Sequence, residues 1–336
     1  VMEVGRERTV LHQNAPHLVI PEKMLLPIVL GGAFGIVASA LGLTFYDFLA
    51  SVKRDERKKI LNLAQTLEQE PLLNRKILKG GCLYSEHRTD DARLTLEIIK
   101  TACEKGAIAA NYVMMDQFLY EGGKIKGVVC HDLLDGRKYT LQTKKVVNAS
   151  GPWVDNIREQ DEPIKGKKLH HTKGIHIVVP HEKLPLNQST YFDVFDGRMA
   201  FAIPRENTTY IGTTDTDYKG DLTNPCASLE EVTYLIKAAN NMFPSSPIDQ
   251  ADIISSWAGI RPLIHQEGKS PSEISRKDEI FESTSGLLSI AGGKLTGYRK
   301  MAEKVVNAVN HYLNKNYNMP YNPCQTSNVI INGGVI

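Results

Sequence analysis

The sequence predicts an α/β (α+β) fold, in which a doubly wound sheet carries an inserted domain built on an antiparallel sheet. Two segments have the pattern of a strand that runs through small residues and glycine into a helix, at residues 145–158 and 287–309. Between them, residues 165–281 form longer alternating strands around one helix, Leu229–Met242. Ligands of doubly wound sheets bind at the carboxyl ends of the strands, so both junctions are candidate sites.

The first residues of the chain mix helix and strand. Residues 1–8 are typical of a charged helix, and Met24–Leu30 has the character of a strand. We expect a buried helix over Phe34–Leu49 and polar helices over Lys53–Leu67 and Pro71–Arg75. The uncharged run around the first of these helices is interrupted by a proline and four glycines, which argues against a membrane span.

The next elements lead to the first junction. A strand is expected over Gly80–Glu86, and Asp90 caps a helix over Ala92–Glu104. Short strands then fill residues 107–147, and the last of them enters Ser150 and Gly151 before a helix that begins near Trp153. This order predicts the first strand-to-helix junction of the doubly wound sheet.

The second junction is the most informative stretch of the chain. Leu287–Ala291 is a short apolar strand, Gly292 and Gly293 break it, Lys294 follows, and a helix begins. Glycine lets backbone approach a ligand, the first N–H groups of a helix lack intrahelical partners, and lysine adds a positive charge. The pattern predicts an anion site, with Met301, Val305, Val306 and Val309 on one side of an amphipathic helix.

The same tripeptide occurs a second time in a different context. Gly122-Gly123-Lys124 lies between two alternating segments, as in a β-hairpin, where the glycines only supply a positive φ. The neighbouring sequence, rather than the tripeptide, therefore indicates the anion site.

Composition excludes several classes of function. The chain of 336 residues has 42% hydrophobic and 23% charged residues and a net charge of +2, which is ordinary for a globular protein and argues against nucleic-acid binding. The five cysteines are far apart, which favours reduced thiols in a cytoplasmic protein and gives no disulfide or metal framework. We therefore expect no metal and no nucleic-acid partner.

Several motifs together resemble the FAD-dependent glycerol-3-phosphate dehydrogenases, within the wider superfamily of FAD-dependent oxidoreductases. They appear in the family's order: GLTFYD at Gly42–Asp47, RTDDARL at Arg88–Leu94, ASGPWV at Ala149–Val154, KGIHIVVP at Lys173–Pro180, IGTTD at Ile211–Asp215, GIRPL at Gly259–Leu263 and GGKLTGYRK at Gly292–Lys300. The resemblance covers nearly the whole chain. Several motifs in register are far more specific than any one of them.

The resemblance also indicates what is missing. The family begins with a G-x-G-x-x-G turn for the FAD pyrophosphate, and that motif does not occur in these residues. The chain is therefore expected to be truncated at this FAD fingerprint and before a C-terminal helical domain. The doubly wound FAD-binding domain would then be incomplete.

The resemblance implies a domain plan. Residues 1–164 and 284–314 would form the FAD-binding domain, with residues 18–75 contributing partly to the substrate domain. Residues 165–283 would form the substrate domain, and residues 315–336 a linker to the missing domain.

The resemblance implies oxidation of glycerol 3-phosphate to dihydroxyacetone phosphate by hydride transfer to flavin N5. Arg261 and Lys294 would hold the phosphate, His176 would take the hydroxyl proton or serve as a hydrogen-bonded strand residue, and Thr214 would contact the substrate or form a polar turn. Arg261 is expected after a short apolar strand at Ile253–Ile254. The expected cofactor-binding residues are Ala149, Ser150, Gly151, Gly292, Gly293, Lys294, Leu295 and Thr296.

Other interpretations stay open on the sequence. The chain could be an amino-acid or amine oxidase of the same superfamily, with Arg261 on a carboxylate, or an inactive binding fragment. The resemblance implies a quinone or oxygen as the electron acceptor. A cytoplasmic location, contact with the inner face of the cell membrane and a homodimer are compatible with the sequence and are not fixed by it.

Overall fold

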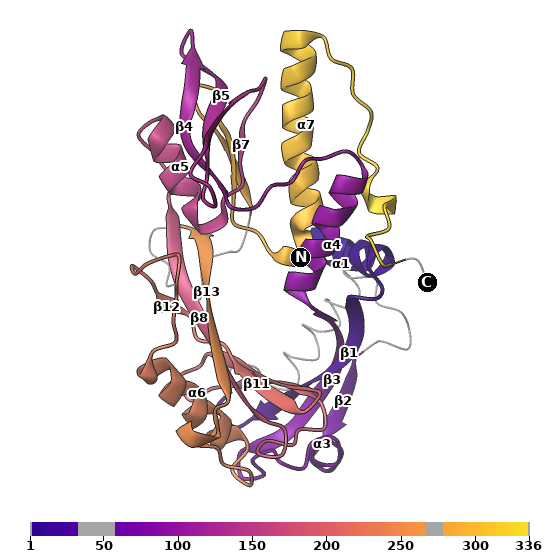
Figure 1. The fold of residues 1–336 in the computed structure, drawn as a ribbon. Coiled ribbons are helices and arrows are strands. Elements are labelled where there is room, and N and C mark those ends of the chain that lie inside the picture. Colours follow the sequence, from indigo (N-terminus) through magenta and orange to yellow (C-terminus); the bar gives the residue numbers. More distant parts are fainter. Residues whose placement is uncertain (1, 33–57, 266–277, 335–336) are drawn as a thin grey trace. The chain divides into compact units, whose positions relative to one another are not determined.

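The computed structural model describes residues 2–32, 58–265 and 278–334. Packing divides the chain into two compact units, which are described separately (Figure 1). Unit 1 comprises Val1–Arg6, Ile20–Arg88 and Thr172–Ile260, and unit 2 comprises Glu7–Val19, Thr89–His171 and Arg261–Ile336. No helix in the described part of the chain is both long and apolar enough to span a membrane.

The largest sheet has nine strands and belongs mainly to unit 1. Its order is β12-β8-β11-β10-β9-β1-β3-β2, with β13 paired to β8. Its strands are β1 (Val19–Val29), β2 (Lys59–Asn62), β3 (Leu78–Thr89), β8 (Leu169–Pro180), β9 (Ser189–Asp193), β10 (Met199–Arg205), β11 (Thr208–Gly212), β12 (Thr216–Asp217) and β13 (Ser255–Ile264). The helices in the described part of this unit are α3 (Leu63–Gln69), η2 (Gln250–Asp252) and α6 (Leu229–Met242).

Helix α6 packs on one face of this sheet, as Figure 1 shows near β8 and β11. Along β8, Ile175, Ile177 and Val179 are buried and alternate with more exposed residues. They form one core with Leu235 and Met242 of α6. His176 therefore lies on the face of β8 that points away from α6.

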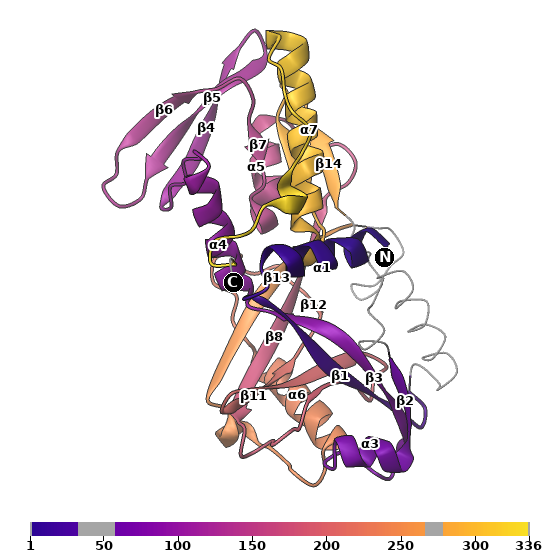
Figure 2. The ribbon, with the colours of Figure 1, turned by 90° about the vertical axis from the view of Figure 1, so that its right-hand side faces the viewer.

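Unit 2 contains two three-stranded sheets, β14-β15-β7 and β4-β5-β6, and the second is seen most clearly in Figure 2. Their strands are β4 (Val113–Glu121), β5 (Lys124–Asp132), β6 (Lys138–Gln142), β7 (Val147–Asn148), β14 (Glu279–Glu282) and β15 (Leu288–Ala291). Among its described residues, the helices are α1 (Met2–Asn14), α4 (Asp91–Glu104), η1 (Gly151–Trp153), α5 (Val154–Asp161), η4 (Leu295–Gly297), α7 (Tyr298–Tyr317) and η5 (Thr326–Asn328).

A buried ion-pair network joins α1 to the start of α7. Arg299 donates to both carboxylate oxygens of Glu7, at 2.7 and 2.6 Å, and also to Glu303 at 2.8 Å. These hydrogen bonds hold the pKa of Arg299 above its ordinary value, although burial opposes the shift. Because Arg299 is the second residue of α7, the network fixes the first turn of this helix.

Most expected elements are present. Helix α6 spans Leu229–Met242 as predicted, Asp90 caps α4 by accepting the N–H of Arg93, and the β4–β5 hairpin turns at Gly122 and Gly123 with φ of 57° and 72°. The mixed fold class is confirmed by the structure and by the family match below. The helix expected over Phe34–Leu49 lies outside the described residues.

Three local predictions were wrong. Lys59–Asn62 is strand β2 rather than helix, because it pairs with β3, and a helix begins only after Asn62. Pro71–Arg75 forms turns. Val306 is 52% exposed, so it does not lie on the buried side of α7 with Val305.

The borders of the packed units also differ from the expected domain borders. Packing places a border at residues 171/172, inside β8, and another at 260/261, inside β13. The borders expected from the sequence lie in the loops at 164/165 and 283/284, because a change in sequence character is visible only between elements. The assignment of a role to each unit remains a proposal.

Candidate active site

Both predicted strand-to-helix junctions meet at one edge of a sheet in unit 2. Strands β7 and β15 pair in parallel, with Leu288 opposite Val147 and Ser289 opposite Asn148. Parallel strands end at the same edge, so Ala149–Gly151 and Gly292–Gly293 leave the sheet side by side. The structure thus brings together two segments that the sequence places far apart.

The glycines at this edge have backbone conformations that other residues rarely adopt. The φ angles are +59° at Gly151, +75° at Gly292 and +85° at Gly293. A Cβ atom on Gly151 would meet no atom within 4 Å, whereas one on Gly293 would lie 2.7 Å from Cε of Met301. The edge therefore presents bare backbone, with open space above Gly151.

Two short helices start from this edge without side-chain caps. Ser150, before η1, and Lys294, before η4, make no capping hydrogen bond with their side chains. The first N–H groups of such turns are available to an anion. Lys294 and Leu295 are exposed and Thr296 is half-buried, so the lysine charge stands in solvent beside the turn.

Asn148 organises the first junction and was not predicted. Its Oδ1 accepts from the N–H of Ser150 at 3.3 Å and from the Ser150 hydroxyl at 2.7 Å. Its Nδ2 donates to the carbonyl of Val154 at 2.9 Å and to the hydroxyl of Ser289 at 3.2 Å. Asn148 is buried and ties β7, β15 and α5 together. The sequence signal that could have indicated this role is an asparagine at the end of a β-branched strand.

This edge fits a nucleotide cofactor that carries phosphates. Positive-φ glycines, uncapped helix starts and a lysine are the features that bind anions through backbone. Within residues 2–32, 58–265 and 278–334, no group of three or more His, Cys, Asp or Glu side chains is placed to hold a metal ion.

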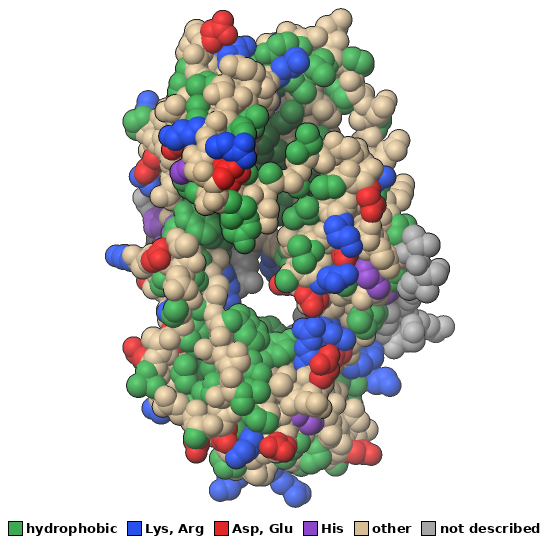
Figure 3. Space-filling model, in the orientation of Figure 1, with side chains coloured by type: hydrophobic (Ala, Val, Ile, Leu, Met, Phe, Trp, Pro, Cys, Tyr) green, Lys and Arg blue, Asp and Glu red, His purple; other side chains and the backbone are tan. Residues whose placement is uncertain are grey.

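His176 lies on the face of β8 opposite α6, in unit 1. Its ring stacks on Trp257, with 4.8 Å between centroids and 12° between planes, and Tyr210 meets it edge-on at 6.1 Å. Hydrophobic side chains gather where β13 and its neighbours lie (Figure 3), and Ile254 and Trp257 are among the exposed ones. Trp257 and Tyr210 were not predicted, because an aromatic residue in a strand is usually part of the core.

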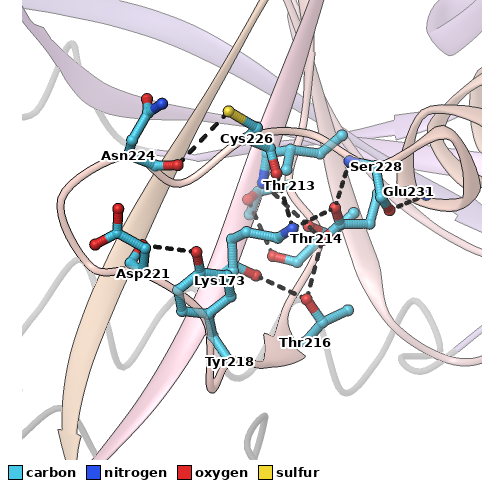
Figure 4. Close-up of polar contacts among 11 residues, drawn as sticks. Lys173, Thr213, Thr214, Thr216, Tyr218, Asp221, Asn224, Cys226, Ser228 and Glu231 are labelled. Atoms are coloured by element: carbon cyan, nitrogen blue, oxygen red, sulfur yellow. Dashed lines mark hydrogen bonds and ion pairs between the residues drawn. The ribbon is translucent and has the colours of Figure 1, made fainter.

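Thr214 belongs to a polar network beneath this region (Figure 4). Its hydroxyl accepts the N–H of Ile175 at 3.0 Å and lies 3.5 Å from Oε1 of Glu231, and the residue is only 2% exposed. Glu231 forms an ion pair of 2.8 Å with Lys173, whose ammonium also donates to the carbonyl of Cys226 at 2.8 Å. The network ties β8 to the start of α6.

The charge state of this network follows from its hydrogen bonds. Burial alone would raise the pKa of Glu231, but hydrogen bonds from Lys173, Ser228 and Thr216 hold that pKa below its ordinary value. The carboxylate is therefore ionised at neutral pH and forms a charge pair with Lys173.

Arg261 is half-buried inside β13, rather than after a strand at Ile253–Ile254 as expected. The dipeptide Ile253–Ile254 precedes β13, which begins at Ser255 and pairs with β8, so the strand itself carries Arg261. Arg261 and Lys294 belong to unit 2, whereas His176 and Thr214 belong to unit 1.

Comparisons with known proteins identify the family. The family model described as FAD dependent oxidoreductase matches residues 4–299. The chain belongs to this family. The resemblance indicated by the sequence motifs is thereby confirmed.

Several relatives of this FAD-dependent oxidoreductase are closely similar. An aerobic glycerol-3-phosphate dehydrogenase of Bacillus subtilis is 54% identical over 334 residues, which are 99% of this chain and 60% of the relative. The enzyme of the same name from Staphylococcus aureus strain USA300 is 52% identical over 336 residues. The chain spans about 60% of the length of these curated relatives.

Solved structures agree with this family. The glycerol-3-phosphate dehydrogenase of Bacillus halodurans, complexed with FAD, has a TM-score of 0.83 and 48% identity over 99% of this chain and 58% of its own. An L-alpha-glycerophosphate oxidase of Mycoplasma pneumoniae with FAD bound has a TM-score of 0.70, 14% identity, and covers 92% of this chain and 82% of its own. The second likeness shows a shared fold alone.

Proposed function

We propose that the chain forms the FAD-binding and substrate-binding body of a glycerol-3-phosphate dehydrogenase, which oxidises sn-glycerol 3-phosphate to dihydroxyacetone phosphate. The observation that carries the proposal is the parallel pairing of β7 and β15, which sets two glycine turns and Lys294 at one edge. The relatives at 54% and 52% identity bear this enzyme's name. In this proposal unit 2 binds the cofactor and carries Arg261 and Lys294, and unit 1 carries His176.

FAD is the cofactor that this edge would hold. Backbone at the two junctions would approach it closely, and the uncapped start of η4 would favour negative charge nearby. The chemistry supplied by a bound FAD would be the acceptance of a hydride from C2 of the alcohol. The residues assigned to it are Ala149, Ser150, Gly151, Gly292, Gly293, Lys294, Leu295 and Thr296.

Charged and polar side chains would act on the substrate. Arg261 and Lys294 supply two cations for a phosphate dianion, and the planar guanidinium suits two parallel hydrogen bonds. His176 would accept the hydroxyl proton, because the ordinary pKa of imidazole lies near neutrality. The hydroxyl of Thr214 is already hydrogen-bonded, so we assign it to fixing β8 beneath the site.

A direct test is flavin reduction. The FAD-loaded protein is mixed anaerobically with glycerol 3-phosphate, glycine, sarcosine or proline, and the visible flavin band is followed. Rapid bleaching by glycerol 3-phosphate alone is expected. Bleaching by the amines alone would instead favour the amino-acid or amine oxidase, and no bleaching at all would favour a binding fragment.

Partners and location are part of the same proposal. Electrons would pass to a quinone or to oxygen, and the protein would be cytoplasmic with contact at the inner face of the membrane. Reoxidation of the reduced protein by a soluble quinone, compared with air-saturated buffer, distinguishes the acceptors. Sedimentation with anionic vesicles tests the membrane contact, and analytical ultracentrifugation tests a homodimer.

A further inference from the structure

The ring of His176 lies directly over a glycine of the neighbouring strand. His176 of β8 is paired with Gly212 of β11. A Cβ atom on Gly212 would lie 2.6 Å from Nε2 and 2.8 Å from Cγ of His176, distances that real side chains do not adopt. The imidazole thus occupies the place that a side chain at residue 212 would need.

Aromatic rings fix the same imidazole from β13 and from β11. The indole of Trp257 is stacked on it at 4.8 Å and nearly parallel, and Tyr210 lies edge-on to His176 and 5.7 Å from Trp257. The N–H of Ile254 donates to the carbonyl of Val178 at 2.9 Å, which holds this end of β13 beside β8. The three rings therefore come from three adjoining strands of one sheet.

We propose that Gly212 and Trp257 are positioning residues that clamp the imidazole of His176 in one orientation for proton transfer. The proposal rests on the role of His176 given above. A strand histidine ordinarily exchanges between staggered rotamers, and a proton acceptor must be held within hydrogen-bond reach of its donor. Stacking of Trp257 on the ring and the bare backbone of Gly212 beneath it restrict the orientation of the imidazole.

The orientation can be observed without activity. The FAD-loaded protein is labelled at histidine Cε1, and the His176 resonance is assigned among the ten histidines as the one absent from His176→Ala. An indole stacked at this distance shifts the ring-proton resonance upfield. Trp257→Ala is expected to remove this shift, and Trp257→Phe to keep part of it.

Turnover provides the second readout. Trp257→Ala should lower kcat by about tenfold or more with a smaller change in KM, because small misplacements of a catalytic group are costly, and Trp257→Phe should restore much of the loss. Gly212→Ala should displace the resonance and lower kcat. Gly259→Ala is the matched control, since a Cβ there meets no atom within 4 Å.

The outcomes separate the two proposals. An unchanged His176 resonance in Trp257→Ala would overturn the clamp. If Trp257→Ala loses the upfield shift but His176→Ala keeps full activity, the role of His176 is overturned while the clamp stands.

Stability tests the contact between Gly212 and His176. In a His176→Ala background, Gly212→Ala should not lower the free energy of unfolding further. An equal cost in both backgrounds contradicts the contact, even if Gly212→Ala alone folds poorly.

Discussion

Lys294 and Lys124 occupy the same tripeptide, Gly-Gly-Lys, in two backbone contexts. Lys124 follows a hairpin turn and donates to the carbonyl of Thr284 at 2.7 Å. Lys294 stands at the start of η4, where strand β15 ends beside β7. The capacity of Lys294 to help bind an anion therefore depends on the unsatisfied N–H groups next to it.

This difference predicts the effect of neutral substitutions. Lys294→Met should lower kcat/KM for glycerol 3-phosphate by about 100-fold, roughly 2.7 kcal/mol, because a charge-assisted contact to the phosphate is lost. Lys124→Met, in the hairpin, is the control and should leave kcat/KM within about twofold. Equal losses in both variants would contradict the assignment of Lys294 to the substrate.

Arg261 is predicted to behave differently from a simple positive charge. Arg261→Lys keeps the charge but loses the planar pair of donors, so KM should rise by roughly tenfold or more. Steady-state kinetics with glycerol 3-phosphate checks this, and circular dichroism reports whether the variant is folded. A normal KM in Arg261→Lys would show that bidentate binding is not used.

The ion pair of Lys173 and Glu231 is the strongest single-residue prediction for stability. The two side chains are only 11% and 8% exposed. Lys173→Met would leave a buried carboxylate without its main partner and should lower the free energy of unfolding by about 3 kcal/mol in urea titrations. Lys168→Met is the control, since its pair with Glu159 is 54% exposed on both sides and should contribute less than about 1 kcal/mol.

The pair also predicts a pH dependence. The folded-state pKa of Glu231 lies below its ordinary value of 4.5, so its stabilisation is present above about pH 4.5 and is lost as the pH falls toward the folded-state pKa. The difference in unfolding free energy between the wild type and Lys173→Met should be constant near neutrality and shrink below about pH 4.5. A difference that grows on acidification would refute this sign.

At the scale of elements, the glycine turn after β15 is the most constrained feature. Gly293 has a φ of +85°, and a Cβ there would also press on Met301 at the start of α7. Gly293→Ala should therefore weaken FAD binding as well as lower the free energy of unfolding by about 1–2 kcal/mol. Isothermal titration with FAD and urea unfolding measure the two effects.

Gly122→Ala provides the comparison for this element. Its φ is +57°, but a Cβ there meets no atom within 4 Å, so only the backbone strain of a positive φ lowers the stability. We expect lower stability with unchanged FAD affinity. Weaker FAD binding in Gly122→Ala would mean that the loss of FAD affinity in Gly293→Ala follows from lower overall stability and not from a change in the turn after β15.

Some elements were predictable because their signals are local. Helix α6 has its cap in the sequence, since Ser228 and Glu231 form a reciprocal capping box. Strand β2 has the sequence Lys-Ile-Leu-Asn, which does not alternate between apolar and polar residues, and only its pairing with β3 makes it a strand rather than the predicted helix. The strand around Arg261 likewise depends on the pairing of β13 with β8.

At the scale of the whole molecule, the two packed units each contain one of the two tryptophans. Trp153 lies in unit 2 and Trp257 in unit 1. Each unit has its own hydrophobic core among the described residues, so each is expected to respond separately to a ligand that binds it. Single-tryptophan variants, Trp153→Phe and Trp257→Phe, make this measurable by fluorescence.

The prediction concerns the effect of FAD on each unit. At FAD concentrations about 100 times Kd, the unfolding free energy of unit 2 should rise by roughly 2.7 kcal/mol, as reported by Trp153, and that of unit 1 by less. Urea titrations of the two variants, with and without FAD, provide the values. Equal shifts would instead indicate that the protein unfolds as one cooperative body.

The sequence alone determined the strand-to-helix junctions, the capped helices, the glycine hairpin and the family resemblance, because each depends on residues within one short segment. The tertiary structure decided which segments meet. It set Ala149–Gly151 beside Gly292–Gly293 through the β7–β15 pairing, and it placed Gly212 and Trp257 against His176. Strand pairing joins residues that are distant along the chain, and no local pattern encodes a partner, so these contacts exist only after folding.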